Sequence, residues 1–321
     1  MAEFRTSRRA QGLGLAILSA LAFGGSGAVA RPLIDAGLDP LHVTWLRLAG
    51  AALLLLPVAL RHRSALRARP WLLLAYGAFP MAGVQALYFA SIARIPVGVA
   101  LLIEFLGPVL VLLWVRLVRR RPVSRGSAIG VVLAVAGLAC LVEIWVGIRL
   151  DALGLALALG AAACQAGYFL LSDAEGDTVD PLAVISYGAL TATALMTLLA
   201  RPWTLPWNVL IGPVEVAGST APAPLLLAWL VAVATVLAYI TGVAAIRRLT
   251  PTVAGAVAYL EVVTAIVAAW LLLGESLTTP QLIGAVIVLA GAFAAQRSIP
   301  DTAPATANAQ TRDGHEPPVR A

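Results

Sequence analysis

The sequence contains no lysine and few charged residues of either sign. All 22 of its basic residues are arginine, and charged residues make up 12% of the 321 residues, against 60% hydrophobic residues. A soluble domain of this length would carry about twice that charged fraction. These values exclude a soluble globular protein and predict an all-α polytopic membrane protein.

Cysteine and the short motifs of common catalytic sites are also scarce. The two cysteines, Cys140 and Cys164, lie within apolar segments, a position typical of small buried residues rather than of a disulfide or a metal pair. The sequence has no phosphate-binding loop, no HExxH zinc motif and no nucleophile elbow. We therefore expect no enzyme activity, no cofactor and no metal, and we do not expect the chain to drive transport with ATP.

Apolar blocks of about twenty residues, the length that crosses a bilayer core of about 30 Å, recur along the chain. Each block must be helical, because lipid offers no partner for an unpaired backbone amide. The blocks predict ten transmembrane helices, at residues 12–30, 40–60, 71–92, 96–116, 124–142, 152–172, 181–200, 224–246, 251–273 and 280–297. Residues 1–11 then form a cytoplasmic N-terminal segment. Residues 298–321 lack apolar periodicity and are predicted to be a disordered cytoplasmic tail.

The arginines are distributed unevenly between the two sides of these helices. With the N-terminus inside, 15 arginines near helix ends face the cytoplasm, and 4 face the opposite side, namely Arg31, Arg94, Arg149 and Arg201. Cytoplasmic loops are enriched in basic residues, so this asymmetry places both termini in the cytoplasm. The same placement accounts for the sequence pI of 10.0 without a nucleic acid partner. We expect a multi-pass protein of the inner or plasma membrane.

The second half of the sequence repeats short motifs of the first half. LGLA at 13–16 recurs at 153–156, and LDPL at 38–41 recurs as VDPL at 179–182, at offsets of 140 and 141 residues. PWLLLA from Pro70 matches PLLLAW from Pro224 at an offset of 154. At this offset Arg94, Leu106, Gly130 and Gly137 fall on Arg248, Leu260, Gly284 and Gly291. The extra 13 residues fall in the Pro- and Trp-containing loop at 201–224, where an insertion is tolerated.

The repeat predicts two copies of a five-helix unit, residues 12–142 and 152–297. Because five is odd, the second copy enters the membrane from the opposite side, which gives two inverted five-helix repeats. Many secondary transporters have this architecture, with the substrate site near the midplane where the copies meet. The repeat also favours a retained first helix over a secretory signal cleaved after AVA at 28–30, because cleavage would leave one copy with four helices.

Two glutamates lie inside predicted helices, where an ionisable side chain is costly. Glu104 is the one acid in VALLIEFLGPVL, and Glu261 is the one acid in VAYLEVVTAIVAAW. In the repeat, Glu104 is equivalent to Ala258 and Glu261 to Gly107, so each copy offers one acid, about one turn apart. Intramembrane acids commonly line a transport pathway, although each could simply bond a neighbouring helix. Pro108 is predicted to loosen the helix at Glu104, because it removes a backbone hydrogen bond to the Glu104 carbonyl.

Arg47, in HVTWLRLAGAALLLL, is the third charged residue within a predicted helix. Its repeat equivalent is Gly188, so the duplication does not support it. Arg47 could neutralise Glu104 or Glu261, bind a substrate carboxylate, or extend its side chain toward a membrane interface. The polar residues that could line a pocket, or could bond between helices, are Gln85, Tyr88, Gln165, Tyr168 and Tyr239.

A buried glutamate can hold or release a proton, as a proton-coupled carrier requires. As a carboxylate it could instead bind the ammonium group of an amino acid or amine. The two roles are compatible if the proton and the cationic group compete for the same acid. Glu143 and Glu275, by contrast, lie at predicted helix ends near water and are assigned a structural role.

The segment 247–295 resembles the second half of the EamA domain of the drug/metabolite transporter superfamily. The matching positions are Leu260, Glu261, Val263, Gly274, Glu275, Leu277, Thr278, Gln281, Gly284 and Gly291. The Leu-Glu-Pro-Val element of the family has Val262 in place of proline here, so a kink in that helix is not implied. EFLGP in the first half is similar to the threonine/homoserine (amino-acid) exporter branch. The resemblance implies a ten-helix inner-membrane carrier with cytoplasmic termini that exports small metabolites.

We therefore predict a secondary active transporter that exports amino acids or related small polar metabolites by proton exchange. Glu104, Glu261 and Arg47 would be its substrate or proton-coupling residues, and its partners would be a small-molecule substrate, protons and the lipid bilayer. Two alternatives remain open. One is a carrier of drugs or of anionic, nucleotide-type metabolites, with Arg47 binding the anion. The other is a membrane scaffold or receptor that transports nothing. The sequence does not indicate whether the protein is a monomer or a homodimer.

Overall fold

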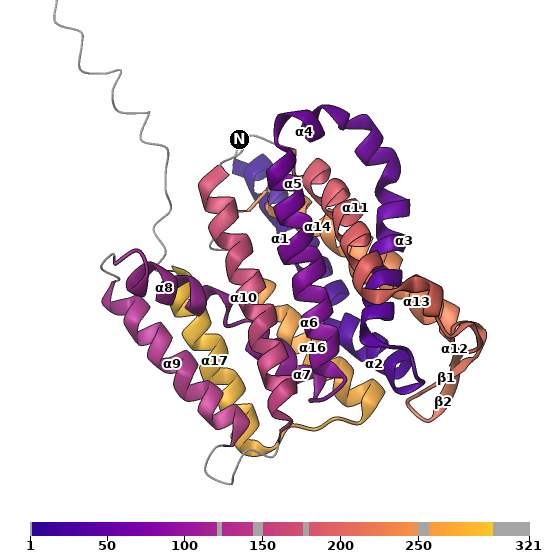
Figure 1. The fold of residues 1–321 in the computed structure, drawn as a ribbon. Helices are drawn as coiled ribbons and strands as arrows, with labels where there is room; N and C mark the ends of the chain where they lie inside the picture. The colour runs from indigo at the N-terminus through magenta and orange to yellow at the C-terminus, as the bar shows by residue number, and fades with distance from the viewer. Residues whose placement is uncertain are drawn as a thin grey trace, which may run out of the picture.

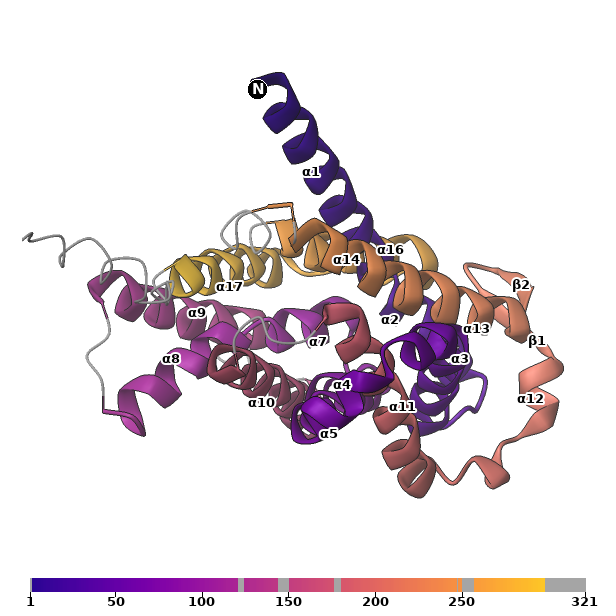
Figure 2. The ribbon, with the colours of Figure 1, turned by 90° about the horizontal axis from the view of Figure 1, so that it is seen from above.

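In the computed structural model, the described residues form a bundle of helices with one short β-hairpin (Figure 1; Figure 2). The residues that the structure describes are 2–120, 124–143, 150–175, 180–246, 248–249 and 257–297. Within these, the side chains of 2–9, 127, 168–175, 246 and 295–297 are not described. The predicted tail at 298–321 lies outside the described residues.

The second to fifth spans of the first half begin and end within one residue of their predicted bounds, whereas the helices of the first span extend beyond the predicted 12–30 on both sides. α1 (Ala2–Gly24) and α2 (Ser26–Asp35) together form the first span. The third span contains a π-helical stretch, η1. The remaining elements of this half are α3 (Pro40–Arg61), α4 (Arg63–Ala68), α5 (Pro70–Tyr76), η1 (Gly77–Gly83), α6 (Val84–Ile92), α7 (Val97–Glu104), α8 (Gly107–Leu117) and α9 (Arg125–Val142).

The second half has the same order of helices, with an added segment between its second and third spans. The long elements are α10 (Ala152–Glu175), α11 (Pro181–Ala200), α13 (Ala223–Val231), the π-helical η4 (Ala232–Leu237), α14 (Ala238–Ile246), α16 (Leu260–Leu273) and α17 (Thr279–Arg297). The added segment contains the 3-10 helix η3 (Pro202–Thr204), α12 (Trp207–Ile211), β1 (Pro213–Val216) and β2 (Ser219–Pro222).

Six helical segments of the described chain are long and apolar enough to cross a membrane. They are Ala10–Asp35, Pro40–Arg61, Pro70–Ile92, Val97–Leu117, Pro181–Ala200 and Ala223–Ala245. Shorter apolar helices accompany them at Ala128–Val142, Ala152–Gly167, Leu260–Leu273 and Thr279–Ala294. The protein is therefore a multi-pass helical membrane protein. The first segment is packed into the bundle, with Ala28 and Ala30 of the alternative cleavage motif fully buried in α2.

The repeated LDPL and VDPL motifs begin equivalent helices in the two halves. Asp39 caps α3, with its Oδ1 accepting the Leu41 N–H at 2.8 Å, and Asp180 caps α11 by accepting the Leu182 N–H at the same distance. The proline after each aspartate lies in the first turn, where a missing N–H costs no helical hydrogen bond. The sequence repeat is therefore a repeat of helix starts.

Residues 201–224, predicted to be a loop, contain regular structure. β1 and β2 form an antiparallel hairpin in which Val214 pairs with Ala221. Ala217 and Gly218 make its turn with φ of 52° and 75°, the left-handed pair that suits two-residue hairpin turns. The sequence predicted a loop between two spans here without any strands, because strands of four residues give little periodic signal among prolines.

Helix contacts follow the sequence repeat. α1 packs against α14 and α16, and its equivalent α10 packs against α6 and α8, the equivalents of α14 and α16. Two further equivalent pairs, α3 with α11 and α9 with α17, pack against each other, and α9 and α17 lie side by side in both ribbon views (Figure 1; Figure 2). Each of these contacts between helices therefore has an equivalent contact when the two copies are interchanged.

Equivalent helices run in opposite directions where they meet. In the α3–α11 pair, Trp45 Nε1 donates to Thr197 Oγ1 at 2.8 Å. Tyr187, near the start of α11, donates its hydroxyl to the Ala59 carbonyl near the end of α3, also at 2.8 Å. Early residues of one helix therefore meet late residues of the other, and the pair is antiparallel.

Glycines let α9 and α17 approach backbone to backbone. A Cβ on Gly284 would lie 2.8 Å from the Gly137 carbonyl oxygen, and a Cβ on Gly291 would lie 2.7 Å from the Gly130 carbonyl oxygen. This crossing is also antiparallel. Small residues at a helix crossing are a common way to pack helices in membranes, where apolar burial does not drive association. The four glycines are the two equivalent pairs of the sequence repeat, so both copies contribute equally to the crossing.

Each copy interrupts its third and fourth spans at equivalent positions. The π turns η1 and η4 overlap at the repeat offset of 154, although only η1 contains a proline, Pro80. α7 ends at Glu104, and α8 begins at Gly107. In the second copy, a turn at Tyr259 precedes the start of α16 at Leu260. The second copy therefore makes both interruptions without a proline.

The α9–α17 crossing predicts opposite effects of the same substitution at two glycines. Gly284→Ala places a methyl group 2.6 Å from Leu141 N, so the helices must move apart, at a cost of about 1–3 kcal/mol. Gly14→Ala adds the same group where no atom lies within 4 Å, and alanine has the higher helix propensity. Thermal unfolding in detergent, followed by circular dichroism, should show a lower midpoint for Gly284→Ala only. Equal midpoints for the two variants would contradict a close crossing.

Candidate functional site

Arg47, in the middle of α3, is buried and bonded to neutral acceptors. Only 1% of the residue is exposed. Its Nη1 donates to Gln85 Oε1 of α6 at 2.7 Å. Its Nε donates to Thr235 Oγ1 at 2.6 Å and its Nη2 to the Ala234 carbonyl at 2.7 Å, both in η4. The guanidinium also lies 5.4 Å from the centroid of the Phe89 ring. The side chain therefore points into the bundle and not toward a membrane interface.

The π turn of η4 arranges the acceptors that Arg47 uses. Thr235 donates its hydroxyl to the Leu230 carbonyl, five residues earlier, at 2.8 Å, which orients the oxygen lone pairs toward the guanidinium. The widened backbone of a π turn leaves carbonyls that can accept other donors, and such turns are frequent at functional sites. A helix of the first copy is in this way tied to a helix of the second copy.

The equivalent junction on the other side of the bundle is apolar. Gly188, the repeat equivalent of Arg47, packs so closely that a Cβ there would lie 2.8 Å from Met81 Sδ. Met81 lies in η1 and is the repeat equivalent of Thr235. The duplicated backbone is thus retained on both sides, while the arginine–threonine contact is present on one side only.

Glu104 and Glu261 lie at the two helix breaks. Glu104 is the last residue of α7 and is 7% exposed, and Glu261 is the second residue of α16 and is half-buried. The N-terminus of a helix stabilises negative charge, whereas its C-terminus does not. The structure therefore stabilises a carboxylate at Glu261 more than at Glu104. Both acids come from interrupted helices, one in each copy.

Arg47, Glu104 and the half-buried Glu261 share one electrostatic region. The charges of both Glu104 and Glu261 act on Arg47, and the charge of Glu261 acts on Glu104. Arg47 donates to Gln85, Thr235 and a backbone carbonyl, and among the described residues no direct ion pair joins it to either acid. Arg47 therefore affects the acids through space and not by contact.

Two buried polar atoms near Glu104 have no hydrogen-bond partner in the described part of the chain, Tyr88 Oη and Gln165 Oε1. Tyr88 is 4% exposed, and the charge of Glu104 acts on it. Gln165 faces Gly107 at the α7–α8 break, where a Cβ would lie 2.5 Å from its Oε1. An unpaired buried polar atom costs about 1–3 kcal/mol, so both atoms are suited to bind water or a polar ligand. A third such atom in the described part of the chain is Nδ1 of His42, near the start of α3.

The remaining predicted site residues have different surroundings. Tyr239 of α14 acts electrostatically on Arg47 and packs edge-on against Phe23, with 4.9 Å between ring centroids. Pro108 is in the first turn of α8, directly after the break. The side chain of Tyr168 lies outside the described residues. Helices α3, α6, α7, α14 and α16 thus bring together six of the predicted site residues: Arg47, Gln85, Tyr88, Glu104, Glu261 and Tyr239.

Of the three partners of Arg47, only Gln85 was among the candidate residues named from the sequence, and Thr235 and Ala234 were not. Thr235 lies in an apolar run without any polar periodicity, and the role of Ala234 depends only on its backbone carbonyl. The one available signal was Pro80, which lies at the equivalent position of the other copy. A proline inside a helix predicts an interruption, and the repeat offset would have transferred that interruption to η4.

Two equivalent helical units that meet around buried ionisable side chains are typical of a membrane transporter. The model of the EamA-like transporter family matches this chain twice, at residues 10–143 and 152–295. The chain therefore belongs to the EamA-like transporter family, within the drug/metabolite transporter superfamily.

Proteins of known name and structure show the same relationship. The chain is similar to threonine/homoserine exporter RhtA of Escherichia coli strain K12, with 33% identity over 252 residues, 76% of this chain and 78% of that protein. It is similar to threonine/homoserine exporter RhtA of Salmonella typhimurium strain LT2, with 31% identity over 258 residues, 80% of this chain and 82% of that protein. A crystal structure with 18% identity covers 91% of this chain and 96% of its own, with a TM-score of 0.52, and shares the fold.

The bond between Arg47 and η4 predicts a difference between two threonine substitutions. Thr235→Val removes the acceptor of the Arg47 Nε–H inside the bundle, which should destabilise the protein by about 1.5–3 kcal/mol, the range for hydrogen bonds to charged groups. Thr241→Val is the matched control, because Thr241 is also buried but bonds only carbonyls of its own helix region. Thr235→Ser should restore most of the stability. The thermal unfolding midpoint in detergent is the measurement, and equal losses for both valine variants would disprove the role of Thr235.

Proposed function

We propose that this protein is a secondary active transporter that exports amino acids or related small polar metabolites in exchange for protons. The observation that carries the proposal is the pair of glutamates at the helix breaks, buried Glu104 in one copy and half-buried Glu261 in the other, with a buried arginine in the same electrostatic region. Charged side chains at membrane depth are costly and commonly mark the path of an ion or a substrate. The names of the two exporters support an amino-acid substrate.

The proposed topology has ten transmembrane helices in two inverted repeats, in the inner membrane, with both termini in the cytoplasm. The antiparallel packing of α3 with α11 and of α9 with α17 supports the inversion. The six long and four shorter apolar helices support the number of spans. In this orientation the β1–β2 hairpin lies on the external side, and α4 with its arginines lies on the cytoplasmic side.

The helix breaks support different roles for the two acids. Glu261, in the first turn of α16, is the better site for a lasting negative charge, so we assign it to the ammonium group of the substrate. Glu104, at the C-terminal end of α7, lacks that support, so we assign it to the exchangeable proton. Arg47 uses three of its five N–H donors within the protein, and the other two can bind a substrate carboxylate. Tyr88 and Gln165 supply the unpaired polar atoms beside them.

The duplicated packing supports alternating access by movement of one copy against the other. The contacts between copies at α1–α14 and α10–α6 are equivalent. If each of these two interfaces adopts the geometry that the other has now, the protein opens to the opposite side of the membrane. The Arg47 contact with η4 has no equivalent at Gly188 and Met81. This asymmetry would make the two open states differ in energy.

The two roles predict separable transport defects in proteoliposomes loaded with labelled threonine or homoserine. Glu104→Gln should remove the dependence of efflux on a pH gradient, because glutamine cannot exchange a proton. Glu261→Gln should raise the half-saturating substrate concentration by about tenfold or more, since a hydrogen bond to a charged group contributes about 1.5–3 kcal/mol. Initial efflux rates across a series of pH gradients and substrate concentrations measure both effects.

Glu215→Gln is the control for these variants, because Glu215 is an exposed acid on β1 away from the helix breaks. If both buried-acid variants keep the pH dependence and affinity of the parent protein, the assigned roles are wrong. Movement of anionic metabolites but not of amino acids would favour the alternative carrier with Arg47 as an anion site. Purified protein that moves no solute would favour the scaffold or receptor.

The topology predicts which engineered cysteines a membrane-impermeant thiol reagent reaches in intact cells. In a background with Cys140→Ala and Cys164→Ala, Thr220→Cys on the hairpin should be labelled from outside. Ser64→Cys on α4 should be labelled only after the cells are opened, because α4 would face the cytoplasm. Both positions are exposed, so exposure alone does not explain a difference. Labelling of Ser64→Cys in intact cells would reverse the proposed orientation.

A further inference from the structure

Glu275 follows the C-terminal end of α16 and is directed back toward the bundle. Gly274 ends α16 with a φ of 68°, a left-handed conformation that glycine adopts without strain. The Glu275 N–H then donates to the Ala269 carbonyl at 3.2 Å, which fixes the turn. The glutamate that the sequence analysis assigned to a solvated helix end is therefore held against neighbouring helices, with 22% of its side chain exposed.

The carboxylate of Glu275 caps the helix that carries Glu104. Its Oε2 accepts the Val97 N–H at 2.8 Å, and Val97 is the first residue of α7. The preceding Pro96 gives no side-chain cap, so this N–H group would otherwise be unpaired. A carboxylate at this position also interacts favourably with the positive end of the helix dipole. A residue of the second copy thus positions a helix of the first copy.

Arg31 of α2 joins the same contacts. Its Nη1 donates to the Ile92 carbonyl at 2.5 Å and lies 3.9 Å from Glu275 Oε1. Its Nε donates to Asp35 Oδ1 at 2.8 Å. Three segments therefore converge on one point: α2, the turn between α6 and α7, and the segment after α16.

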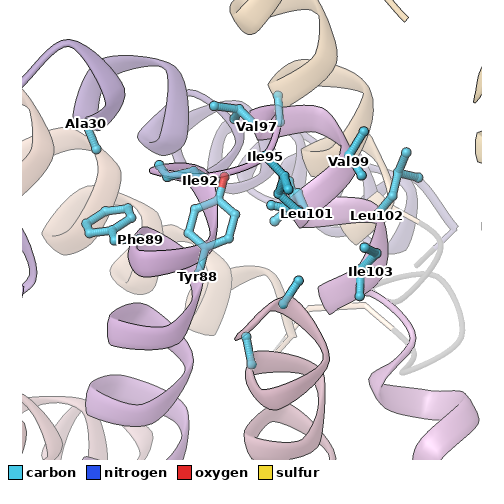
Figure 3. Packing of buried hydrophobic residues seen from close by; sticks show 14 of the residues in the cluster. Ala30, Tyr88, Phe89, Ile92, Ile95, Val97, Val99, Leu101, Leu102 and Ile103 are labelled. Carbon is cyan, nitrogen blue, oxygen red and sulfur yellow. The ribbon is translucent and has the colours of Figure 1, made fainter. Parts of the chain in front are cut away.

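A cavity of about 660 Å³ opens on one side of this cluster. Arg31, Asp35, Glu215 and Glu275 supply its charged lining, and Leu273 supplies part of its apolar lining. The Tyr88 hydroxyl lies next to the Val97 side chain, because both are in contact range of a Cβ placed on Gly27. Figure 3 shows Tyr88 beside the residues that lead into α7. Val97 therefore links the Glu275 carboxylate, which lines the charged cavity, to the surroundings of the Tyr88 hydroxyl.

We propose that Glu275 is a positioning residue that seats the N-terminus of α7 and closes the external end of the route to Glu104. The inference rests on the proposed transport function and on the proposed orientation, in which the hairpin and the cavity face outward. Opening this end requires α7 and the α6–α7 turn to leave Glu275 and Arg31. No substrate contact is assigned to Glu275.

The closure depends on external pH in a defined direction. Burial raises the pKa of Glu275 above its ordinary value, and the Val97 N–H and Arg31 oppose this shift without cancelling it. The titratable and charged groups around Glu275 are Arg31 and Asp35 on α2, Glu215 of β1 in the same cavity lining, and Tyr88 of α6, on which the charge of Glu275 acts. Opening returns Glu275 to water, so its pKa falls and it releases a proton. The closed form therefore binds the proton more tightly, and a falling external pH favours closure.

This direction fits proton exchange. An exporter releases its substrate in an externally open state and must close that side before it returns. Uptake of an external proton that accompanies closure at Glu275 makes this closing step depend on external pH, whereas the exchanged proton itself is assigned to Glu104. A protonated Glu275 still accepts the Val97 N–H through its carbonyl oxygen, so the cap on α7 persists in the closed form.

Cysteine labelling at Ala100 tests the closure without any measurement of transport. Ala100 lies on α7, one turn before Glu104, and is fully buried. In the background without native cysteines, labelling of Ala100→Cys by an external impermeant reagent is divided by labelling of the exposed Thr220→Cys, which corrects for the pH dependence of the thiol reaction. The ratio should rise with external pH, by no more than about tenfold per pH unit for a single titrating group.

Four variants separate the parts of the proposal. Glu275→Gln keeps an acceptor for Val97 but cannot titrate, so the ratio should be low at every pH. Glu275→Ala removes the acceptor, so the ratio should be about tenfold higher than in the Gln variant at every pH. Val97→Pro removes the N–H donor at a position where proline fits a helix start, and it should resemble Glu275→Ala. The matched control Glu215→Gln, an exposed acid of the same cavity lining that does not cap α7, should keep the pH dependence of the parent.

A Glu275→Gln variant with unchanged pH dependence would overturn the role of Glu275, and so would a Glu275→Ala variant with no increase in labelling. Loss of transport in the Glu104 or Glu261 variants does not alter these ratios. The proposed function can therefore fail while the closure holds, or hold while the closure fails. Protein level and the unfolding midpoint of each variant exclude loss of fold as the cause of a changed ratio.

Discussion

The lipid bilayer gives the backbone no hydrogen-bond partner, and this constraint determines where the irregular parts of the protein can lie. The π turns η1 and η4 and the breaks before Gly107 and Leu260 all lie in spans that pack into the bundle. Groups released by an interrupted helix must bond inside the protein, as the Ala234 carbonyl does with Arg47. Interrupted helices and buried charges therefore occur together, because each satisfies hydrogen bonds that the other leaves open.

The duplication explains which features could be predicted from sequence. Helix starts at Asp39 and Asp180 follow from a local motif, and the helix spans follow from apolar length, so both are readable from a single chain. The contacts of Arg47 are not readable in this way, because they depend on a π turn in a segment without proline or polar pattern. The role of Glu275 also depends on a distant residue, Val97, whose N–H carries no sequence signal. Long apolar runs and capping motifs could thus be predicted, whereas the short hairpin and the contacts of Arg47 and Glu275 with distant segments could not.

The two copies share their backbone more closely than their side chains. Glycines at the α9–α17 crossing are matched in both copies, because close backbone approach admits no larger residue at either position. Thr235 and Met81 are not matched, although both lie in π turns at equivalent positions. A duplicated protein can change side chains at such positions without changing the packing of its helices. Function can therefore become asymmetric, with one guanidinium serving a site that both copies surround.

α7 is the element in which these constraints combine. All eight of its residues are buried, so the helix is surrounded by protein and not by lipid or water. Its N-terminus is capped by Glu275, and its C-terminus ends at Glu104, where Gly107 leaves room for Gln165. A short helix with a break at one end and a cap from the other copy at its start can move as a unit. α7 thus places the contact with Glu275 at one end and Glu104 at the other, eight residues along a single helix.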